Sequence, residues 1–447
     1  MLNLPSKLRR RDEPIQVGII GAGLFGTKLT DQLARVPRME PVAIADIETE
    51  KAKTAFEEAG VVDPPTVTDS VEQADAAIER GERAVLTDGM DLAATDVDVV
   101  VEATGVPNAG ARHAYTAITE GKHVVNVTVE MDTVVGPVLA DLAAENGVTY
   151  SYAYGDQPAL MVELYDWART VGMDVVAVGR GSMYVDEYRL GTPDDVFERF
   201  GYDEGFAAKH GLNARMYNSF LDGTKMAVES CALANATGLK PDVPGMHTPT
   251  VEVTEVPEKL RPKEDGGLLD GTGVVETTSS MYPDGSTAAY DLSWSVFVVT
   301  STPNAAVQEY LTQNADHGFH VASDGEYAFF YRPYHLPGIE TPVSVASAAL
   351  RNEPTGAPRG HHAEVVGAAK RTLEPGAELD GGGGYTVYGV LETADRADDR
   401  NHVPFELLEG ATVTEPLARD EVLTYDDVIL EDTFIRRLRE APGEATP

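Results

Sequence analysis

The sequence predicts an α/β protein in which a doubly wound parallel sheet comes first, followed by an α+β domain and a small β module. Three features of the sequence indicate this. Between residues 15 and 153, short apolar runs rich in β-branched residues alternate with amphipathic segments, as in buried parallel strands joined by helices. Residues 159–350 mix long helical segments with alternating stretches. Similar phrases near residues 363–372 and 415–428 each suggest a strand, a polar turn and a leucine, which is typical of a small β module.

In the first block, the apolar runs predict strands at 15–20, 41–45, 97–102, 123–127 and 148–153. The amphipathic segments between them predict helices at 24–35, 48–59, 109–120 and 133–146. Residues 61–96 are polar and poorly periodic. We interpret them as an insertion that carries one helix near 71–80.

In the second block, the pattern predicts a helix at 159–171, a strand at 174–180 and one long helix over 215–237 that stops at Gly238. The stretches 251–256, 273–279 and 290–299 alternate like antiparallel strands, and 343–350 reads as a helix. We therefore expect a ragged arm at 1–13, domains at 14–156, 157–356 and 357–432, and a charged, frayed tail at 433–447. The glycine run 381–384 predicts a loop in the third domain.

The strongest motif is the run Gly21-Ala22-Gly23-Leu24-Phe25-Gly26, which follows the first predicted strand and opens the first helix. The first glycine allows a tight turn, the second lets the backbone approach a pyrophosphate, and the third lets the helix lie close to the sheet. The amide groups of the helix N-terminus favour an anion. This context predicts a Rossmann dinucleotide-binding domain, with Leu24 and Phe25 among the cofactor-binding residues.

Asp46 ends the next predicted strand at the offset expected for a ribose-binding carboxylate. A carboxylate suits the 2′-hydroxyl of NAD and disfavours the 2′-phosphate of NADP. Lys51 and Lys53 follow on a predicted helix and could reach a phosphate. NAD is therefore favoured, and NADP stays open.

Polar residues also follow the next two predicted strands of this block. Thr104 and Gly105 come after the strand at 97–102, and Asn126 closes the strand at 123–127. Ligands of open α/β sheets bind at the carboxyl ends of the strands. We expect these three residues near the nicotinamide end of the cofactor, with an ordinary strand-to-helix turn as the plainer interpretation of Thr104 and Gly105.

A second polar constellation lies in the predicted helix 215–237. Asp222, Lys225 and Glu229 are spaced i, i+3 and i+7 and are expected on one face. Lys225 could act as acid, base or electrophile, and the two carboxylates could orient it or bind a divalent metal such as Mg or Mn. The plainer interpretation is a surface salt-bridge ladder. Gly223 weakens it, because glycine inside a helix is unfavourable without a close approach.

Two further residues are candidates. Asp156 stands where the strand at 148–153 passes into a helix, so it either caps that helix or faces the substrate. Arg332, in Tyr-Arg-Pro-Tyr-His, could hold a phosphate or carboxylate, and a structural pairing is equally consistent with its position.

The composition excludes several classes of protein. The net charge is −38, from 73 acidic and 35 basic residues, and such a field repels nucleic acid and anionic membranes. No apolar run approaches the length of a membrane span, and the N-terminal segment lacks a signal-peptide pattern. The single cysteine, Cys231, allows no intrachain disulfide and lies in an apolar helical pattern. We expect a cytoplasmic protein in which Cys231 is a packing residue.

Residues 97–154, with Val-Glu-Ala-Thr-Gly and Glu-Gly-Lys-His-Val-Val-Asn, resemble the cofactor domain of homoserine dehydrogenases. Those enzymes carry a lysine shortly after the asparagine, where this chain has Val-Thr-Val-Glu. The homoserine dehydrogenase reaction itself is therefore not expected here.

The phrases at 154–160, 218–225, 331–336, 344–350 and 383–389 resemble a homoserine dehydrogenase-like group that ends in a SAF domain, a small β-clip module. The resemblance covers nearly the whole chain. It implies an oxidoreductase, and some bacterial members act as a second type of 1-deoxy-D-xylulose 5-phosphate reductoisomerase with NADPH and a divalent metal. The spread of acidic residues also resembles proteins of salt-in halophiles.

Together these features predict an oxidoreductase that moves hydride between a nicotinamide and a small polyhydroxylated carbonyl or alcohol, such as a sugar acid, a sugar phosphate or a hydroxy or keto acid. Its partner is a small-molecule substrate, and a homo-oligomer, either dimer or tetramer, is expected. Three alternatives remain: a reductoisomerase-like enzyme, a lyase or isomerase that retains the nucleotide, and a dinucleotide-binding sensor without turnover.

The acidic composition leads to a test of salt dependence. Screening at molar salt removes much of the self-repulsion of the surface charge. We expect the melting temperature, followed by circular dichroism, to rise between dilute buffer and molar KCl. An unchanged melting temperature would contradict the expected halophilic adaptation.

Overall fold

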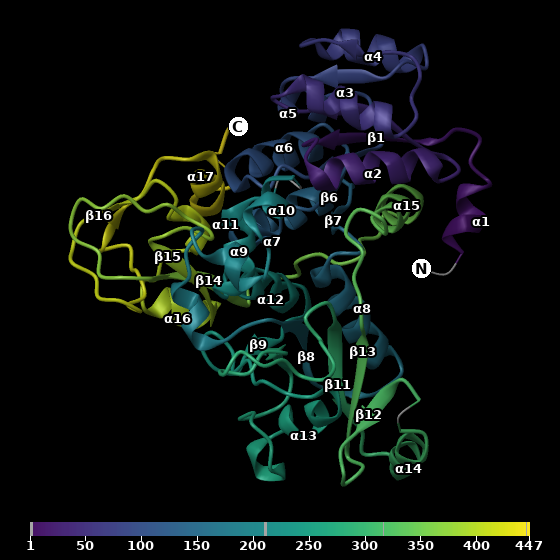
Figure 1. The fold of residues 1–447 in the computed structure, drawn as a ribbon. Helices are drawn as coiled ribbons and strands as arrows, with labels where there is room; N and C mark the ends of the chain where they lie inside the picture. The colour runs from purple at the N-terminus through teal and green to yellow at the C-terminus, as the bar shows by residue number, and fades with distance from the viewer. Residues whose placement is uncertain (1–2, 210–211, 316, 444) are drawn as a thin grey trace. The chain divides into compact units, whose positions relative to one another are not determined.

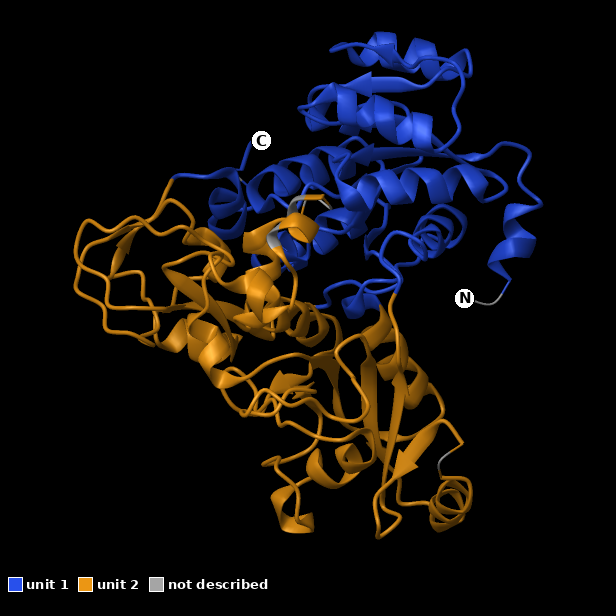
Figure 2. Ribbon diagram, in the orientation of Figure 1, with its two compact units in different colours: residues 1–159, 336–359, 432–447 blue, residues 160–335, 360–431 orange. Residues whose placement is uncertain are grey.

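The computed structural model describes residues 3–209, 212–315, 317–443 and 445–447. Its contacts divide the chain into two compact units (Figure 2). Unit 1 contains Met1–Ala159, Leu336–Arg359 and Asp432–Pro447, and unit 2 contains Leu160–His335 and Gly360–Glu431. The first boundary falls inside helix α8 (Gln157–Thr170).

Unit 1 is built on a seven-stranded parallel sheet with the order β3-β4-β2-β1-β5-β6-β7. The first part of the chain, which forms this sheet, is coloured purple to blue in Figure 1. The strands are β1 (Ile15–Ile20), β2 (Met39–Ala45), β3 (Thr66–Val67), β4 (Ala84–Leu86), β5 (Val99–Glu102), β6 (His123–Asn126) and β7 (Tyr150–Tyr152). Their order reverses at β1, which pairs with β2 on one side and β5 on the other. This reversal is the topological switch point at which open sheets bind ligands. The predicted doubly wound sheet is confirmed.

Helices and apolar side chains enclose this sheet. The helices are α2 (Leu24–Arg35), α3 (Thr49–Glu58), α4 (Val71–Glu79), α5 (Gly89–Ala93), α6 (Pro107–Thr119), α7 (Val129–Glu145) and α15 (Pro342–Arg351). The core contains strand residues such as Ile15, Val17, Ile19 and Val101, packed with Leu29 of α2. Continuous β-branched strands thus fill the layer between the helices, as the sequence pattern predicts.

The interpretation of residues 61–96 as an insertion is wrong. The segment adds β3 and β4 to the sheet, and β4 is fully buried and pairs in parallel with β2. The expected helix near 71–80 is present as α4. A strand of only three residues is too short to show a periodic pattern, which explains the error.

The expected N-terminal arm and frayed tail are also ordered elements of unit 1. Helix α1 (Leu4–Leu8) buries both of its leucines. Helix α17 (Phe434–Glu440) begins at the cap Thr433 and buries Phe434, Ile435 and Leu438. The spacing of these three apolar residues places them on one helix face, a signal that the surrounding arginines and acids obscured. Residues 1 and 2 of the arm lie outside the described ranges.

Unit 2 contains a six-stranded mixed sheet with the order β12-β13-β11-β8-β10-β9. The strands are β8 (Asp174–Ser182), β9 (Lys240–Pro241), β10 (Val274–Ser279), β11 (Val296–Ser301), β12 (Phe319–Val321) and β13 (Tyr327–Arg332). Strand β8 pairs in parallel with β10 and antiparallel with β11. The expected antiparallel arrangement is therefore only partly present.

The helical elements of unit 2 lie mostly before or between these strands. The α-helices beyond α8 are α9 (Val196–Arg199), α10 (Glu204–Lys209), α11 (Ala214–Leu221), α12 (Thr224–Thr237), α13 (Val256–Lys259), α14 (Ala305–Gln313) and α16 (Ala394–Asp399). Short 3₁₀ turns occur at Asp186–Leu190, Val253–Glu255, Lys263–Asp265 and Phe405–Leu407. The predicted strand at 251–256 is thus replaced by a 3₁₀ turn and the start of α13.

The predicted single helix over 215–237 is two helices. Helix α11 ends at Leu221, and α12 begins at Thr224. Gly223 between them has φ 90°, a left-handed conformation that favours glycine and ends the helical path. Gly223 therefore marks a change of chain direction rather than a close approach inside a helix.

The C-terminal part of unit 2 (residues 360–431, the C-terminal module) is mainly β, as expected. Strands β14 (Ala363–Ala369) and β15 (Val387–Thr393) form an antiparallel pair, and β16 (Thr412–Val413) pairs with β17 (Val428–Ile429). Bridges such as Leu373 to Leu417 join the two similar phrases of the sequence. The assignment of this module to the SAF type stays a prediction. Within the described ranges, no helix is long and apolar enough to cross a bilayer.

The packing of α17 leads to a stability prediction. The Phe434 ring is 2% exposed and lies 5.6 Å from the ring of Tyr115, centroid to centroid. Phe434→Ala should lower the free energy of unfolding by about 3–5 kcal/mol, measured by urea denaturation in high salt. Arg437→Ala on the same helix should change it little. Equal stability of Phe434→Ala and the wild type would contradict a folded tail.

Candidate functional site

The glycine loop of unit 1 has the geometry that a dinucleotide requires. Gly21 has φ 101°, and a Cβ there would lie 2.6 Å from the carbonyl oxygen of Ala103. A Cβ on Gly26 would lie 1.9 Å from the carbonyl oxygen of Gly21, so only glycine lets α2 pack this close to the sheet. Around Gly23, by contrast, the space where a Cβ would stand is open. Gly23 is the N-cap of α2 and supplies no side-chain cap, which leaves the first turn, with Leu24 and Phe25, open to a pyrophosphate.

Asp46 lies directly beside this loop. One carboxylate oxygen accepts a hydrogen bond from the backbone N–H of Ala22 at 2.8 Å, and the other accepts one from Glu48 N–H at 2.8 Å. Lys51 pairs with Glu48 at 2.5 Å, and Lys53 with Glu50 at 2.6 Å. Both lysines thus face carboxylates, one at the N-cap of α3 and one within that helix. The carboxylate of Asp46 fits a ribose diol better than a 2′-phosphate.

Thr104, Gly105 and Asn126 lie at the adjoining ends of β5 and β6, as predicted from their positions. Glu102, paired with Asn126 across the strands, is buried and accepts hydrogen bonds from the hydroxyls of Thr104 and Thr128. Gly105 N–H donates to the Thr128 hydroxyl at 3.0 Å. This buried carboxylate therefore holds both strand ends in place.

The amide of Asn126 has one possible orientation. Its nitrogen lies 3.1 Å from the carbonyl oxygen of Thr128, which can only accept, and 3.0 Å from the hydroxyl of Tyr150. Tyr150 must then donate its own proton to Asp132, whose oxygen is 2.9 Å away. The chain of donors thus runs from Asn126 through Tyr150 to Asp132.

Sequence reasoning missed Asp132. It is fully buried in α7. Burial raises the pKa of its carboxyl to about 7, although a hydrogen bond from Tyr150 acts to lower that pKa. A Cβ on Gly136 would lie 2.3 Å from an Asp132 oxygen, so this glycine makes room for the carboxyl group. The signal in the sequence was the pair Gly136-Pro137 inside a helix, which is unfavourable unless something requires it.

In unit 2, the structure brings Lys225 and Glu229 together on α12. Their charged groups are 4.0 Å apart, and Glu229 also forms an ion pair with Arg180 of β8. All three side chains are mostly buried. Arg180 was not predicted, although a charged residue at the end of an apolar strand was a usable signal.

Arg332 and His335 belong to the same group of charges. Arg180 and Arg332 both pair with Val296 of β11, one on each side, so their side chains project from the same face of the sheet. His335 stacks on Trp294, and the charges of Glu229, Arg180 and Arg332 all act on it. Burial lowers the pKa of the His335 ring, which keeps it neutral at pH 7. We call Arg180, Lys225, Arg332, His335 and Glu229 the cationic cluster.

Asp222 does not join this cluster. Because the chain turns at Gly223, the Asp222 carboxylate contacts Lys370 of the C-terminal module at 2.7 Å instead. The expected shared face of Asp222, Lys225 and Glu229 is therefore wrong. Asp222 and Glu229 each face a cation, which does not suit a divalent metal held between them. The described residues contain no group of three or more potential metal ligands.

Asp156 lies in unit 1, directly before α8. It is partly exposed, and its backbone N–H donates to the carbonyl oxygen of Ala153 at 3.2 Å.

Cys231 is fully buried in α12 of unit 2, as expected for a packing residue.

Two family models match the chain. Residues 21–153 match the model described as "Homoserine dehydrogenase, NAD binding domain", and residues 155–341 match "Oxidoreductase DRL, catalytic domain". The protein is therefore an NAD(P)-binding oxidoreductase with a homoserine dehydrogenase-like cofactor domain. No curated protein sequence matches it.

The solved structures that show a partial likeness to the chain include the following two enzymes. One is 1-deoxy-D-xylulose 5-phosphate reductoisomerase from Zymomonas mobilis in complex with NADPH, with 15% identity and a TM-score of 0.36 over 65% of this chain and 68% of that chain. The other is apo scyllo-inositol dehydrogenase from Lactobacillus casei, with 12% identity and a TM-score of 0.37 over 76% of this chain and 90% of that chain. TM-scores this low do not establish a shared overall fold, and the substrates of these proteins do not carry over.

The buried Asp132 carboxyl leads to a pH prediction. Because its folded-state pKa of about 7 lies above the ordinary value of 3.8, the protonated group favours the folded state. This stabilisation is complete below about pH 4 and is lost as the pH rises through 7. Asp132→Asn cannot ionise, so its free energy of unfolding relative to wild type should rise by about 3 kcal/mol between pH 5 and 8.

Urea denaturation at both pH values in constant salt measures this difference. Asp141→Asn, on the exposed face of the same helix, is the control. A difference between Asp132→Asn and wild type that does not change with pH would contradict a titrating buried carboxyl.

Proposed function

We propose that the protein transfers hydride between a nicotinamide nucleotide bound by unit 1 and a small anionic carbonyl or alcohol compound bound by unit 2. The cationic cluster is the observation that carries the choice of substrate. In a chain of net charge −38, the cationic side chains Arg180, Lys225 and Arg332 lie with the Glu229 carboxylate at one face of the unit 2 sheet. Mostly buried cations attract an anion more strongly than exposed ones, because water screens them less.

Each residue of the cationic cluster has its own role in the proposed reaction. Arg332 and Arg180 offer planar donors that suit a carboxylate or phosphate group of the substrate. Lys225 moves a proton to or from the substrate oxygen, and Glu229 holds the lysine in place. His335 stays neutral and offers a hydrogen bond rather than a charge. When bound, the nicotinamide supplies or accepts the hydride.

A sugar acid, a sugar phosphate or a hydroxy or keto acid combines the required anionic group with the reacting carbonyl or alcohol. The contacts of Asp46, and the pairing of Lys51 and Lys53 with glutamates, favour NAD over NADP. We further propose a cytoplasmic protein adapted to high salt, which the acidic composition and the single cysteine support, and a homo-oligomer. The reductoisomerase-like alternative is less favoured, because its metal would need carboxylates that here face Lys370 and Arg180.

Substitution of Lys225 tests this function. With a panel of sugar acids, sugar phosphates and keto acids, the wild type should oxidise or reduce a member at measurable rate, read as NADH absorbance. Lys225→Met should lower kcat on that substrate by about 100- to 10,000-fold, because it removes the proton-transferring group. Its affinity for NADH, measured by fluorescence titration, should stay unchanged.

Lys259→Met, at an exposed position of unit 2, is the matched control and should behave like the wild type. Near-normal kcat in Lys225→Met would exclude the assigned role. A wild type that binds NADH but turns over no member of the panel would favour the sensor alternative instead.

A further inference from the structure

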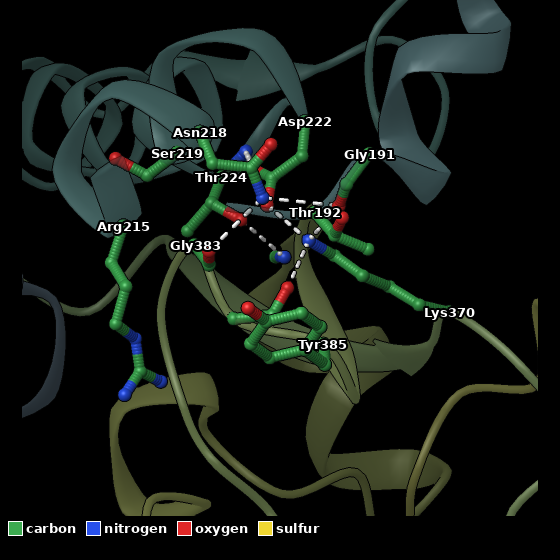
Figure 3. A network of polar contacts seen from close by, with 12 residues as sticks. Gly191, Thr192, Arg215, Asn218, Ser219, Asp222, Thr224, Lys370, Gly383 and Tyr385 are labelled. Atoms are coloured by element: carbon green, nitrogen blue, oxygen red, sulfur yellow. Dashed lines mark hydrogen bonds and ion pairs between the residues drawn. The ribbon is translucent and has the colours of Figure 1, made fainter. Parts of the chain in front are cut away.

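A buried lysine connects the C-terminal module to the helix that carries the cationic cluster. Lys370 follows β14 directly, and its side chain is 2% exposed. Its ammonium group donates to Asp222 at 2.7 Å, to the carbonyl oxygen of Gly191 at 2.8 Å and to that of Gly384 at 2.8 Å (Figure 3). Three donors thus meet three acceptors, which satisfies the buried charge.

The same contacts reach the first turn of α12. The second oxygen of Asp222 accepts a hydrogen bond from Thr224 N–H at 3.0 Å. The Thr224 hydroxyl in turn accepts one from Gly389 N–H of β15, at 2.9 Å. The module therefore contacts the start of α12 through both Asp222 and Thr224, and Lys225 is the next residue along the helix.

Asn218 of α11 extends this network. Its amide nitrogen donates to the carbonyl oxygens of Gly191 and Gly383, at 3.0 and 2.9 Å. Gly383 has φ 63°, and a Cβ there would lie 1.9 Å from the carbonyl oxygen of Arg215. The glycine run 381–384 is thus a contact surface for α11 rather than only a loop.

The polar residues of the 218–229 segment therefore contact two different parts of unit 2. Asn218, Asp222 and Thr224 contact the C-terminal module or the Gly191 carbonyl, whereas Glu229 contacts Arg180 of the sheet and Lys225. A displacement of the first turn of α12 would move Lys225 with it. Misplacement of a reacting group by about 1 Å can lower a rate about 100-fold.

We propose that Lys370 is a positioning residue, through which the C-terminal module sets the place of Lys225 and Glu229 on the sheet. This inference rests on the proposed function, because the proposed function assigns the proton transfer to Lys225. The plainer role is that the buried pair only stabilises unit 2. A test must therefore restore stability and ask whether activity returns with it.

The double variant Lys370→Gln with Asp222→Asn replaces the ion pair by two neutral amides that can still hydrogen-bond. Either single change leaves an uncompensated buried group and should lower the melting temperature sharply, whereas the double variant should recover most of it. We expect kcat of the double variant to stay about 10- to 100-fold below wild type, with KM and NADH affinity nearly unchanged.

A matched control comes from a second ion pair that also reaches the module. Lys240 and Asp395 are 3.0 Å apart, and both side chains are exposed. The double variant Lys240→Gln with Asp395→Asn should keep wild-type kcat. If the Lys370 and Asp222 double variant recovers both the melting temperature and kcat, the pair is only structural and the proposal is wrong.

A second readout needs no substrate. Acetic anhydride acetylates lysines at a rate that depends on their surroundings, and mass spectrometry can compare Lys225 with the exposed Lys259 in the same molecule. The labelling ratio of Lys225 to Lys259 should change at least about threefold in the Lys370 and Asp222 double variant. If the double variant fails to fold, Thr224→Val takes its place, and the ratio should shift in that variant.

These two readouts separate the possible failures. A wild type without turnover on the panel contradicts the proposed function alone. An unchanged labelling ratio in the double variant and in Thr224→Val contradicts the positioning role alone.

Discussion

The left-handed turn at Gly223 determines what each polar side chain of the 218–229 segment contacts. If the helix continued through this position, Asp222 would lie on the same face as Lys225 and Glu229. The Lys225 ammonium would then lie near both carboxylates. The turn instead directs Asp222 to Lys370 and leaves Glu229 between Arg180 and Lys225. One residue with φ 90° thus separates the enclosed ion pair of Asp222 and Lys370 from the cationic cluster. The second arrangement suits recognition of an anion, and the first suits the joining of two parts of the chain.

Unit 1 shows a related division between close packing and open space. Gly21 and Gly26 are required because neighbouring backbone would overlap any side chain, whereas Gly23 faces open space. The polar groups beneath the strand ends form a hydrogen-bonded network around Glu102, Asn126 and Asp132. A cofactor therefore meets a surface whose hydrogen-bonding directions are already set. Preorganisation of this kind reduces the cost of ordering on binding.

Much of this architecture could be predicted from local patterns. The strand at 15–20, the helix at 24–35 and the glycine loop between them agree with the structure, because periodicity and glycine spacing are local properties. The strands β3 and β4 were missed because they are too short to show a period. The candidate site was predictable only in part. Lys225 and Glu229 do meet, but Arg180 reaches Glu229, and Lys370 reaches Asp222, through pairings distant in sequence. The direction of Asp222 depended on a single backbone angle.

The place of α17 has a consequence for the order of folding during synthesis. Unit 1 combines residues from the start of the chain with Leu336–Arg359 and Asp432–Pro447. Its sheet strands all precede unit 2 along the chain, whereas α15 is translated between the two segments of unit 2 and α17 only after the second segment. Until α15 and α17 are synthesised, part of the apolar surface of unit 1 stays uncovered, a state that is prone to aggregation. Completion of the cofactor domain therefore depends on a segment translated after unit 2, long after the glycine fingerprint itself.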